Sequence, residues 1–421
     1  MMRASVEGRS AWHAALLMLI CAAVPAFASA DPRVQELSLD QAEALLMSQP
    51  HISQRLAAAR ARASGEQRAA GRWANPVLEL SDESVSGGGQ SEDERSIWIR
   101  QSLDLSRVRR QRSLAAAAEG GARVADTQHG VRLLIQQLRN SYFNALYWQQ
   151  RTRLLADART RIERLITMIT EQVARGETAQ FDLLRLEQQQ VSVSAREAAS
   201  AARADRDYQR LLALLGLGTQ QGLRLTDPLI PPAPPDLVSL LEQLPRLPVL
   251  RAAQARLDAA QASLRAEQRT RIPEITLGLG HRTVESNGME QDGALVALEV
   301  PLPLYDRRSD QRQIAASNVE STTAELTALQ QQVAGDVRGL WAAATRLRGQ
   351  AMRITEEAER SSSAMLMAAE TGYAEAELSV LQLTDALDTV LSTLLNAHDL
   401  TWAARAAHNE LHRYTLDDSN E

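Results

Sequence analysis

The chain contains two copies of one pattern, and this repeat constrains its fold more than any other feature. Residues 46–81 resemble residues 242–278: Leu78 in the first copy matches Ile275 in the second, about 197 residues later. Two further pairs of matching segments begin at Ser96 and Leu295, and at Arg175 and Thr371, the last with one extra residue in the second copy. Because each repeat is one supersecondary unit, we expect the two halves to pack side by side.

Residues 1–30 have the features of a secretory signal peptide. Basic Arg3 and Arg9 precede an apolar run at 14–28, and an A-x-A cleavage site ends at Ala30. The run is too short for a membrane helix. The only cysteine, Cys21, follows Ile20, where a lipidation site would need a small residue, so cleavage after Ala30 is favoured over lipidation.

Charge and hydropathy exclude two classes of protein. The net charge of -6 argues against a nucleic-acid partner. Beyond residue 30 no run of about 18 apolar residues occurs, so no helical membrane span is predicted. An exported chain of this kind is expected in the periplasm or, as a β-barrel, in the outer membrane.

Helices and strands are expected to follow the same order in both halves. The first repeat covers 31–226, a proline-rich connector with a short helix covers 227–247, and the second repeat covers 248–421. Helices are predicted at 39–47, 50–72, 107–174, 180–215, 237–244, 248–271, 306–370 and 377–414, and strands at 77–85, 97–105, 274–283 and 294–304. In each half, the medium and the later helix together match the length of the long one, so two parallel columns of equal height are expected.

The long helices carry apolar residues in steps of four and three. This heptad spacing predicts knobs-into-holes packing between helices, with alanines that allow close approach. In the second long helix the expected seam is Val333, Val337, Leu340, Ala344, Leu347, Ala351, Ile354, Ala358, Ser361 and Met365.

The strand segments alternate between apolar and polar residues. Ile97 and Ile99 point one way, while Trp98 and Arg100 point the other. Strands of 9–11 residues cross a bilayer when tilted. Four strands leave open edges that lipid cannot satisfy, so a membrane location requires an oligomer, and three copies would supply about twelve strands. The alternative is an ordinary amphipathic sheet packed on helices; the export signal and the long helices favour the first interpretation.

The duplicated helix–hairpin–helix plan and the helix-break motifs at 174–190 and 369–386 resemble TolC-type outer-membrane efflux proteins. SLDQAEALLMSQP and ANPVLELS look most like the CzcC-type heavy-metal branch. The resemblance implies a mainly α fold with a small β part. It implies a homotrimer with a 12-stranded barrel in outer-membrane lipid and helical columns in the periplasm. It also implies a periplasmic adaptor and an inner-membrane pump as partners, with no cofactor and no catalysis.

In that family the helix breaks are periplasmic tip turns that dock the adaptor. The candidate docking residues here are Gly176, Glu177, Gly372 and Tyr373, with Tyr373 expected to be exposed. The alternative is a helical hairpin turn with no partner.

Family members often narrow the tip with acidic residues just after the turn. Asp182 matches such a position, whereas the second copy has Ser379 and Gln382 there. Glu375, Glu377 and Asp385 lie close enough to substitute, and rings of such acids would attract cations. The alternative is a solvated helix face.

Other polar residues receive simpler interpretations. Glu79, Arg100 and Glu299 are expected on the wet inner face of a barrel. His408 and His412 have a spacing that can chelate metal, but we interpret them as a surface pair. No metal site and no catalytic motif is predicted.

The sequence therefore predicts the outer-membrane channel of a tripartite efflux system, with divalent heavy-metal cations as the favoured cargo. One alternative is a similar duct for drugs or secreted polypeptides. Another is a soluble periplasmic coiled-coil scaffold or adaptor, although the β-rich flanks typical of adaptors are missing.

Overall fold

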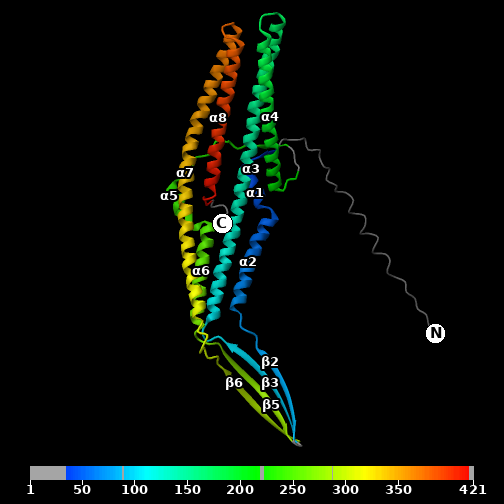
Figure 1. The fold of residues 1–421 in the computed structure, drawn as a ribbon, viewed down its shortest axis with the longest axis vertical. Coiled ribbons are helices and arrows are strands. Elements are labelled where there is room, and N and C mark those ends of the chain that lie inside the picture. The colour runs from blue at the N-terminus through cyan, green and yellow to red at the C-terminus, as the bar shows by residue number, and fades with distance from the viewer. Residues whose placement is uncertain (1–34, 88–89, 219–221, 287, 417–421) are drawn as a thin grey trace, which may run out of the picture.

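The computed structural model describes residues 35–87, 90–218, 222–286 and 288–416. The expected signal peptide, with Cys21 and the cleavage site, lies outside these residues. The chain is a long rod with helices along most of its length and a sheet at one end (Figure 1).

The order of elements repeats as predicted. The first half contains α1 (Leu39–Met47), α2 (Pro50–Gly71), β2 (Val77–Gly87), β3 (Gln90–Leu103), α3 (Val108–Ala174) and α4 (Gln180–Leu215). The second half contains α5 (Leu237–Gln243), a 3-10 turn η1 (Leu244–Arg246), α6 (Pro248–Arg269), β5 (Ile275–Ser286), β6 (Met289–Glu299), α7 (Ser309–Ala374) and α8 (Val380–His412). Both hairpins extend further towards their turns than predicted, because β2 and β5 end later and β3 and β6 begin earlier than expected. At the other end β3 and β6 stop short of the predicted bounds, so Pro301 and Pro303 lie beyond β6.

Each half forms the two columns that the helix lengths predict. The long α3 packs against α2 and then α4, and the long α7 packs against α6 and then α8 (Figure 1). At the junction of α2 and α4, the Gln49 side chain donates to the Leu214 carbonyl at 2.8 Å. Helix α3 of the first half also packs against α6 of the second half, and this contact joins the two halves of the chain.

The seam of α7 differs from the predicted heptad in its later turns. Val337, Ala344, Ala351 and Ala358 are buried as expected. Beyond them the buried stripe moves round the helix, because an α-helix advances by more than 3.5 residues per turn. Ser362 is buried in place of Ser361, while Ile354 and Met365 are 42% and 40% exposed.

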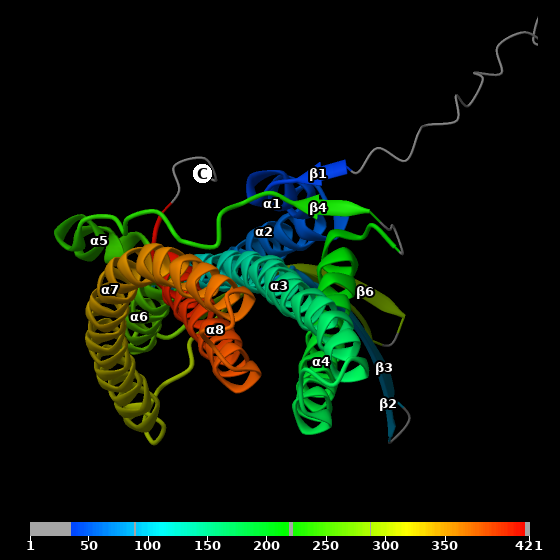
Figure 2. The ribbon, with the colours of Figure 1, turned by 90° about the horizontal axis from the view of Figure 1, so that it is seen from above.

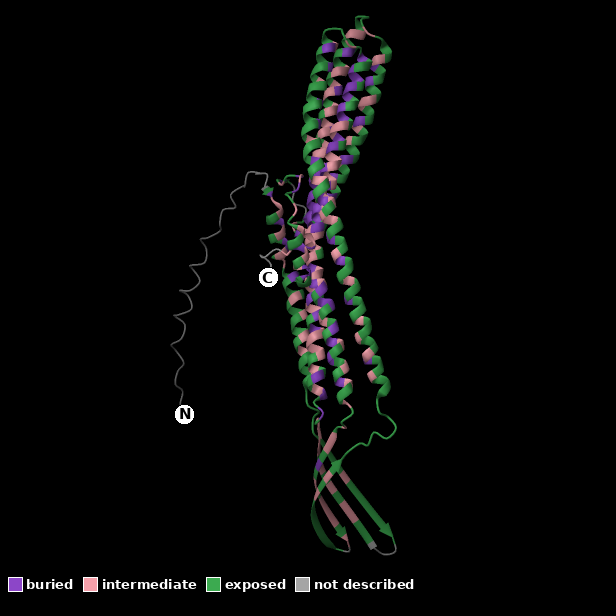
Figure 3. Cartoon of the chain, turned by 90° about the vertical axis from the view of Figure 1, so that its left-hand side faces the viewer, coloured by how far each residue is buried: buried purple, intermediate pink, exposed green. Residues whose placement is uncertain are grey.

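The four long strands form one antiparallel sheet in the order β2-β3-β5-β6. Leu78, Ile99, Leu279 and Val296 lie side by side across it. Strands β2 and β6 are its edges, and within the described residues each pairs with one neighbour. The sheet extends beyond the ends of the helices, so neither of its faces is covered by them (Figures 1 and 3).

A small collar on the convex side of the helices was not predicted (Figure 2). Two short parallel strands, β1 (Gln35–Leu37) and β4 (Leu223–Leu225), join the start and the end of the first repeat. The Tyr142 hydroxyl lies 2.7 Å from the Leu37 carbonyl and 2.6 Å from Asp227 Oδ2, which ties the collar to α3. Within the part of the chain described here, no helix is apolar and long enough to span a membrane.

Candidate docking tips and exposed sheet

The turn between α3 and α4 forms one tip of the rod. Helix α3 ends at Ala174, and Gly176 follows in the left-handed region with φ 75°. The Gly176 and Glu177 amides donate to the carbonyls of Val173 and Gln172, both at 2.9 Å. This is the Schellman hydrogen-bond pattern, which favours glycine at the left-handed position.

The second tip uses a different residue from the one predicted. Helix α7 continues through Gly372 to Ala374, and the left-handed residue is Ala376, with φ 61°. The Glu377 amide donates to the Gly372 carbonyl at 2.8 Å, so the turn has the same Schellman pattern. Gly176 therefore corresponds to Ala376, and the extra residue assumed in the second copy was wrong.

Gly372 and Tyr373 have packing roles instead. Gly372 is buried, and a Cβ there would lie 2.9 Å from Leu378 Cγ. Tyr373 was expected to be exposed, which was wrong: its ring is partly buried between the hairpins, and its hydroxyl donates to Gln172 Oε1 on α3. Tyr373 thus joins the two hairpins just below their tips.

The missing acids of the second copy have a local explanation. Ser379 and Gln382 form a capping box at the start of α8, in which the side chain of each accepts from the backbone amide of the other. Ala179 occupies the matching place before α4 and makes no such cap, which leaves Asp182 free of this role. Glu375 and Glu377 are exposed on the turn itself.

Several charged residues near the tips are paired. Asp385 on α8 accepts from Arg185 on α4 at 3.0 Å, and one turn further Asp388 accepts from Gln189 at 2.6 Å. At the first tip Arg175 binds Glu177 and lowers the pKa of that carboxyl. Asp385 is thus part of a link between hairpins and not an isolated acid.

The predicted inner-face residues lie on one face of the sheet. Arg100 Nε is 3.3 Å from Glu79 Oε2, and its guanidinium lies 5.3 Å from the Trp98 ring centre. Trp98 covers Gly280, where a Cβ would be 2.7 Å from the indole. The register places Glu299 of β6 on this face as well.

The opposite face is apolar and open. Its side chains include Leu78, Leu80, Ile97, Ile99, Leu279, Val296 and Leu298, each more than half exposed. Monomeric soluble proteins rarely expose a contiguous apolar patch of this kind, which marks a membrane or protein contact.

The histidine pair is not on the surface, contrary to the sequence-based interpretation. His408 is 9% exposed, and burial together with Arg405 lowers its pKa to about 4. Burial, Arg139 and His408 lower the pKa of the partly buried His412 to about 3. Among the described residues, no group of three or more His, Cys, Asp or Glu is arranged to hold a metal ion.

Comparison with known proteins agrees with this architecture. The profile of the family "Outer membrane efflux protein" matches residues 241–415. The cobalt-zinc-cadmium resistance protein CzcC of Cupriavidus metallidurans is 27% identical over 212 residues, which is 49% of this chain and 48% of CzcC. The nickel-cobalt-cadmium resistance protein NccC of Alcaligenes xylosoxydans is 29% identical over 281 residues, which is 64% of this chain and 62% of NccC. The matched segments therefore span about half to three fifths of these relatives.

Solved structures share the fold. A membrane protein from Pseudomonas aeruginosa has a TM-score of 0.74 at 20% identity, covering 89% of this chain and 92% of that one. CusC has a TM-score of 0.72 at 17% identity, covering 89% and 91%. These similarities show that the chain has the fold of such channel proteins. The resemblance to the outer membrane efflux protein family and to the heavy-metal resistance proteins is confirmed, as is the mainly α fold class with a small β part.

Proposed function

We propose that three copies of this chain form an outer-membrane channel, the passive exit duct of a tripartite efflux system that exports divalent heavy-metal cations. The observation that carries this proposal is the sheet: it has an exposed apolar face and two edge strands, β2 and β6. In lipid each unpaired backbone group costs several kcal/mol, so the edges must pair with neighbouring subunits. Three four-stranded sheets would close a barrel wide enough for an open lumen.

Cysteine pairs scanned along β2 and β6 test the assembly. The only native cysteine, Cys21, lies in the expected signal peptide, so crosslinks report engineered positions alone. We expect some pairs, with one cysteine in β2 and one in β6, to crosslink neighbouring chains. Dimers and trimers should then form, and nothing larger. A Ser96→Cys/Arg282→Cys pair joins adjacent strands of one chain and serves as the control. A purified, membrane-inserted chain that never crosslinks beyond a monomer would contradict the proposal.

Support for metal cargo comes from the curated relatives, whose names refer to cobalt, zinc, cadmium and nickel. Deletion of the gene is expected to lower tolerance to these cations, with restoration by the intact chain. Loss of drug tolerance with unchanged metal tolerance would favour the duct for drugs. We further propose that Asp182, Glu375, Glu377 and Asp385 favour cations at the aperture, and that Glu79, Arg100 and Glu299 line the barrel.

We also propose that the tip turns dock a periplasmic adaptor, which connects the duct to an inner-membrane pump. Gly176, Glu177 and Glu377 are exposed in the tip turns at the helical end of the rod, where an approaching partner would contact them first (Figure 1). The double charge reversal E177R/E377R is expected to abolish metal tolerance while the trimer still assembles. E320R changes an exposed acid on α7 and is expected to leave tolerance intact. Full tolerance in E177R/E377R would exclude docking through these acids.

A further inference from the structure

Arginines are concentrated where the sheet joins the helices (Figure 1). Four segments lie at this junction, each made of a connection and the adjoining helical turn, at 68–76, 104–112, 266–274 and 300–312. Together they contain eleven arginines and five acidic residues, a surplus of six positive charges in a chain whose net charge is -6. These arginines form what we name the arginine belt: Arg68, Arg72, Arg107, Arg109, Arg110, Arg112, Arg269, Arg271, Arg307, Arg308 and Arg312.

Most members of the arginine belt have no partner within the chain. Three of them donate to oxygen atoms of the junction itself, namely Arg109 to Asp104, Arg269 to Ser106 and Arg312 to Arg307. The other eight residues are exposed, and their guanidinium groups make no hydrogen bond or ion pair with any residue that the structure describes. Their positive charges are therefore available to a partner outside the chain.

Two members of the belt have a backbone conformation that favours other residue types. Arg107 and Arg308 directly precede α3 and α7, at equivalent places in the two halves, with φ of 60° and 50°. The left-handed region suits glycine and asparagine and is strained for most other residues. Arginine nevertheless occupies this position in both repeats, which indicates that its side chain has a role there.

Large apolar and aromatic side chains are exposed in the same segments. Leu105 continues the apolar face of β3 beyond the strand, and Leu302 and Leu304 follow β6. Trp73 and Tyr305 are 56% and 98% exposed. Tryptophan and tyrosine are enriched where a membrane protein passes from hydrocarbon to headgroups. The junction thus combines apolar surface, aromatic rings and unpaired guanidinium groups.

The hairpin end of the sheet carries the opposite charge. Segments 82–94 and 285–292 contain eight acidic residues and no basic residue. Charges that served solubility alone would mix both signs at both ends. Positive charge confined to one end, beside apolar surface, is the arrangement expected next to an anionic membrane surface, where arginine stems lie along hydrocarbon and guanidinium groups reach the phosphates.

We propose that the arginine belt binds the headgroups of anionic phospholipids in the leaflet next to the helices. A guanidinium group binds two phosphate oxygens at once, and an anionic headgroup adds a net attraction that a zwitterionic one lacks. The inference rests on the proposed function, because it requires the sheet to lie in a bilayer. It adds the chemical class of lipid that the channel selects at its boundary.

Spin-labelled lipids in phosphatidylcholine liposomes that contain the full chain test the proposal. Electron paramagnetic resonance distinguishes lipids in contact with the protein from those of the free bilayer. At low ionic strength, labelled phosphatidylglycerol should associate with the protein roughly twofold or more above labelled phosphatidylcholine. This preference should decline as salt is added, because salt screens exposed charges.

Two double variants remove unpaired members of the belt. R107N/R308N places asparagine in the left-handed positions, so its thermal midpoint should not fall while its preference for phosphatidylglycerol decreases. R110Q/R112Q should also lower the preference, and the combination of all four changes should abolish it. The matched control is R338Q/R346Q, which removes two exposed arginines of α7 outside the junction and should keep the preference.

Three results would overturn the proposal, and they have different consequences. Equal association of the two lipids, with a clear population of protein-bound lipid, would exclude the anionic preference and leave the membrane location intact. Absence of protein-bound lipid would exclude the bilayer location of the sheet and, with it, the proposed function. An equal loss of preference in R338Q/R346Q would assign the effect to the net charge of the chain instead of the belt.

Discussion

Gly176 and Ala376 occupy equivalent positions in the two tip turns, both in the left-handed region, with φ 75° and 61°. Glycine adopts this conformation without strain, whereas a Cβ clashes with the following carbonyl, at a cost of roughly 1–2 kcal/mol. A Cβ at Gly176 would meet no heavy atom within 4 Å, so the energetic cost of a side chain at this position comes from the backbone conformation alone.

The substitution A376G is therefore expected to stabilise its tip by about 1 kcal/mol, and G176A to destabilise the other tip by a similar amount. Hydrogen exchange of the turn amides in the assembled protein measures both effects locally. Slower exchange near Gly176 in G176A would contradict the argument.

The same pair of turns shows which feature the sequence could not predict, namely the residue at which the second long helix ends. Glycine in a helix usually marks an end, so Gly372 was taken as the break. Its real role is steric, because only hydrogen fits against Leu378, and this contact depends on the folded turn. Ala376 gives no signal in the sequence, since its conformation is imposed by the Schellman hydrogen bonds.

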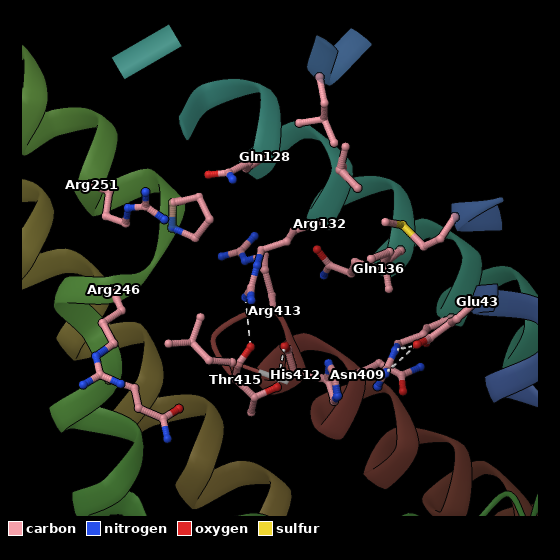
Figure 4. Close-up of a pocket in the computed structure, with 18 of the residues that line it drawn as sticks. Glu43, Gln128, Arg132, Gln136, Arg246, Arg251, Asn409, His412, Arg413 and Thr415 are labelled. Carbon is pink, nitrogen blue, oxygen red and sulfur yellow. Dashed lines mark hydrogen bonds and ion pairs between the residues drawn. The ribbon is translucent and has the colours of Figure 1, made fainter. Parts of the chain in front are cut away.

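Periodic features were predictable and long-range ones were not. The helices and strands follow from local spacing, and the helices predicted at 39–47 and 180–215 have the bounds that the structure shows. The cavity of about 510 Å³ beside the collar (Figure 4) is lined by residues as distant in sequence as Arg60 and Arg413, and no spacing rule connects them. The collar strands have three residues each, too few for alternation to show.

Gly120 lets α2 and α3 approach closely. A Cβ at this position would lie 2.6 Å from Ala63 Cβ and 3.1 Å from Ala63 Cα, so the backbone itself would have to move. G120A is expected to lower the free energy of unfolding by about 1–3 kcal/mol. In the control G121A the Cβ meets nothing within 4 Å, and the gain in helix propensity should stabilise α3 by up to about 1 kcal/mol. Urea unfolding followed by circular dichroism compares them; equal effects would refute the packing argument.

Arg405 of α8 binds the proline-rich connector that precedes the second repeat. It is 5% exposed and donates to the carbonyls of Pro228, Leu229 and Ile230, with its guanidinium 4.0 Å from the Phe143 ring centre. R405K keeps the charge but cannot reach three carbonyls, so stability should fall on the order of 3 kcal/mol. Limited proteolysis should then cut residues 227–236 faster. Arg348, half-buried with one bond to Pro231, provides a graded control, and R348K should have a smaller effect.

The buried histidine makes stability depend on pH. The pKa of His408 is lowered to about 4 in the folded chain, against 6.5 for an unfolded histidine. Below pH 6.5 the unfolded chain binds the proton more readily, so stability falls as the pH decreases from 6.5 towards 4. The loss from pH 7 to pH 5 should be about 2 kcal/mol for His408. Urea midpoints across this range should show a flatter slope for H408Q. H51Q, at an exposed position, should keep the original slope.

The ion pair of Arg185 and Asp385 connects α4 of one hairpin to α8 of the other at 3.0 Å, close to the tips. Both side chains are substantially exposed, so the pair should contribute only about 0.2–1 kcal/mol. Its effect should therefore appear in the spacing of the hairpins more than in global unfolding.

R185D places two acids opposite each other and should separate the hairpins, which raises single-channel conductance in planar bilayers. The exchanged pair R185D/D385R restores opposite charges and should return conductance towards the original value. R196D, an exposed site further along α4 and outside this pair, controls for charge alone. Conductance that rises equally in R185D and R185D/D385R would show that the pair does not hold the tips together.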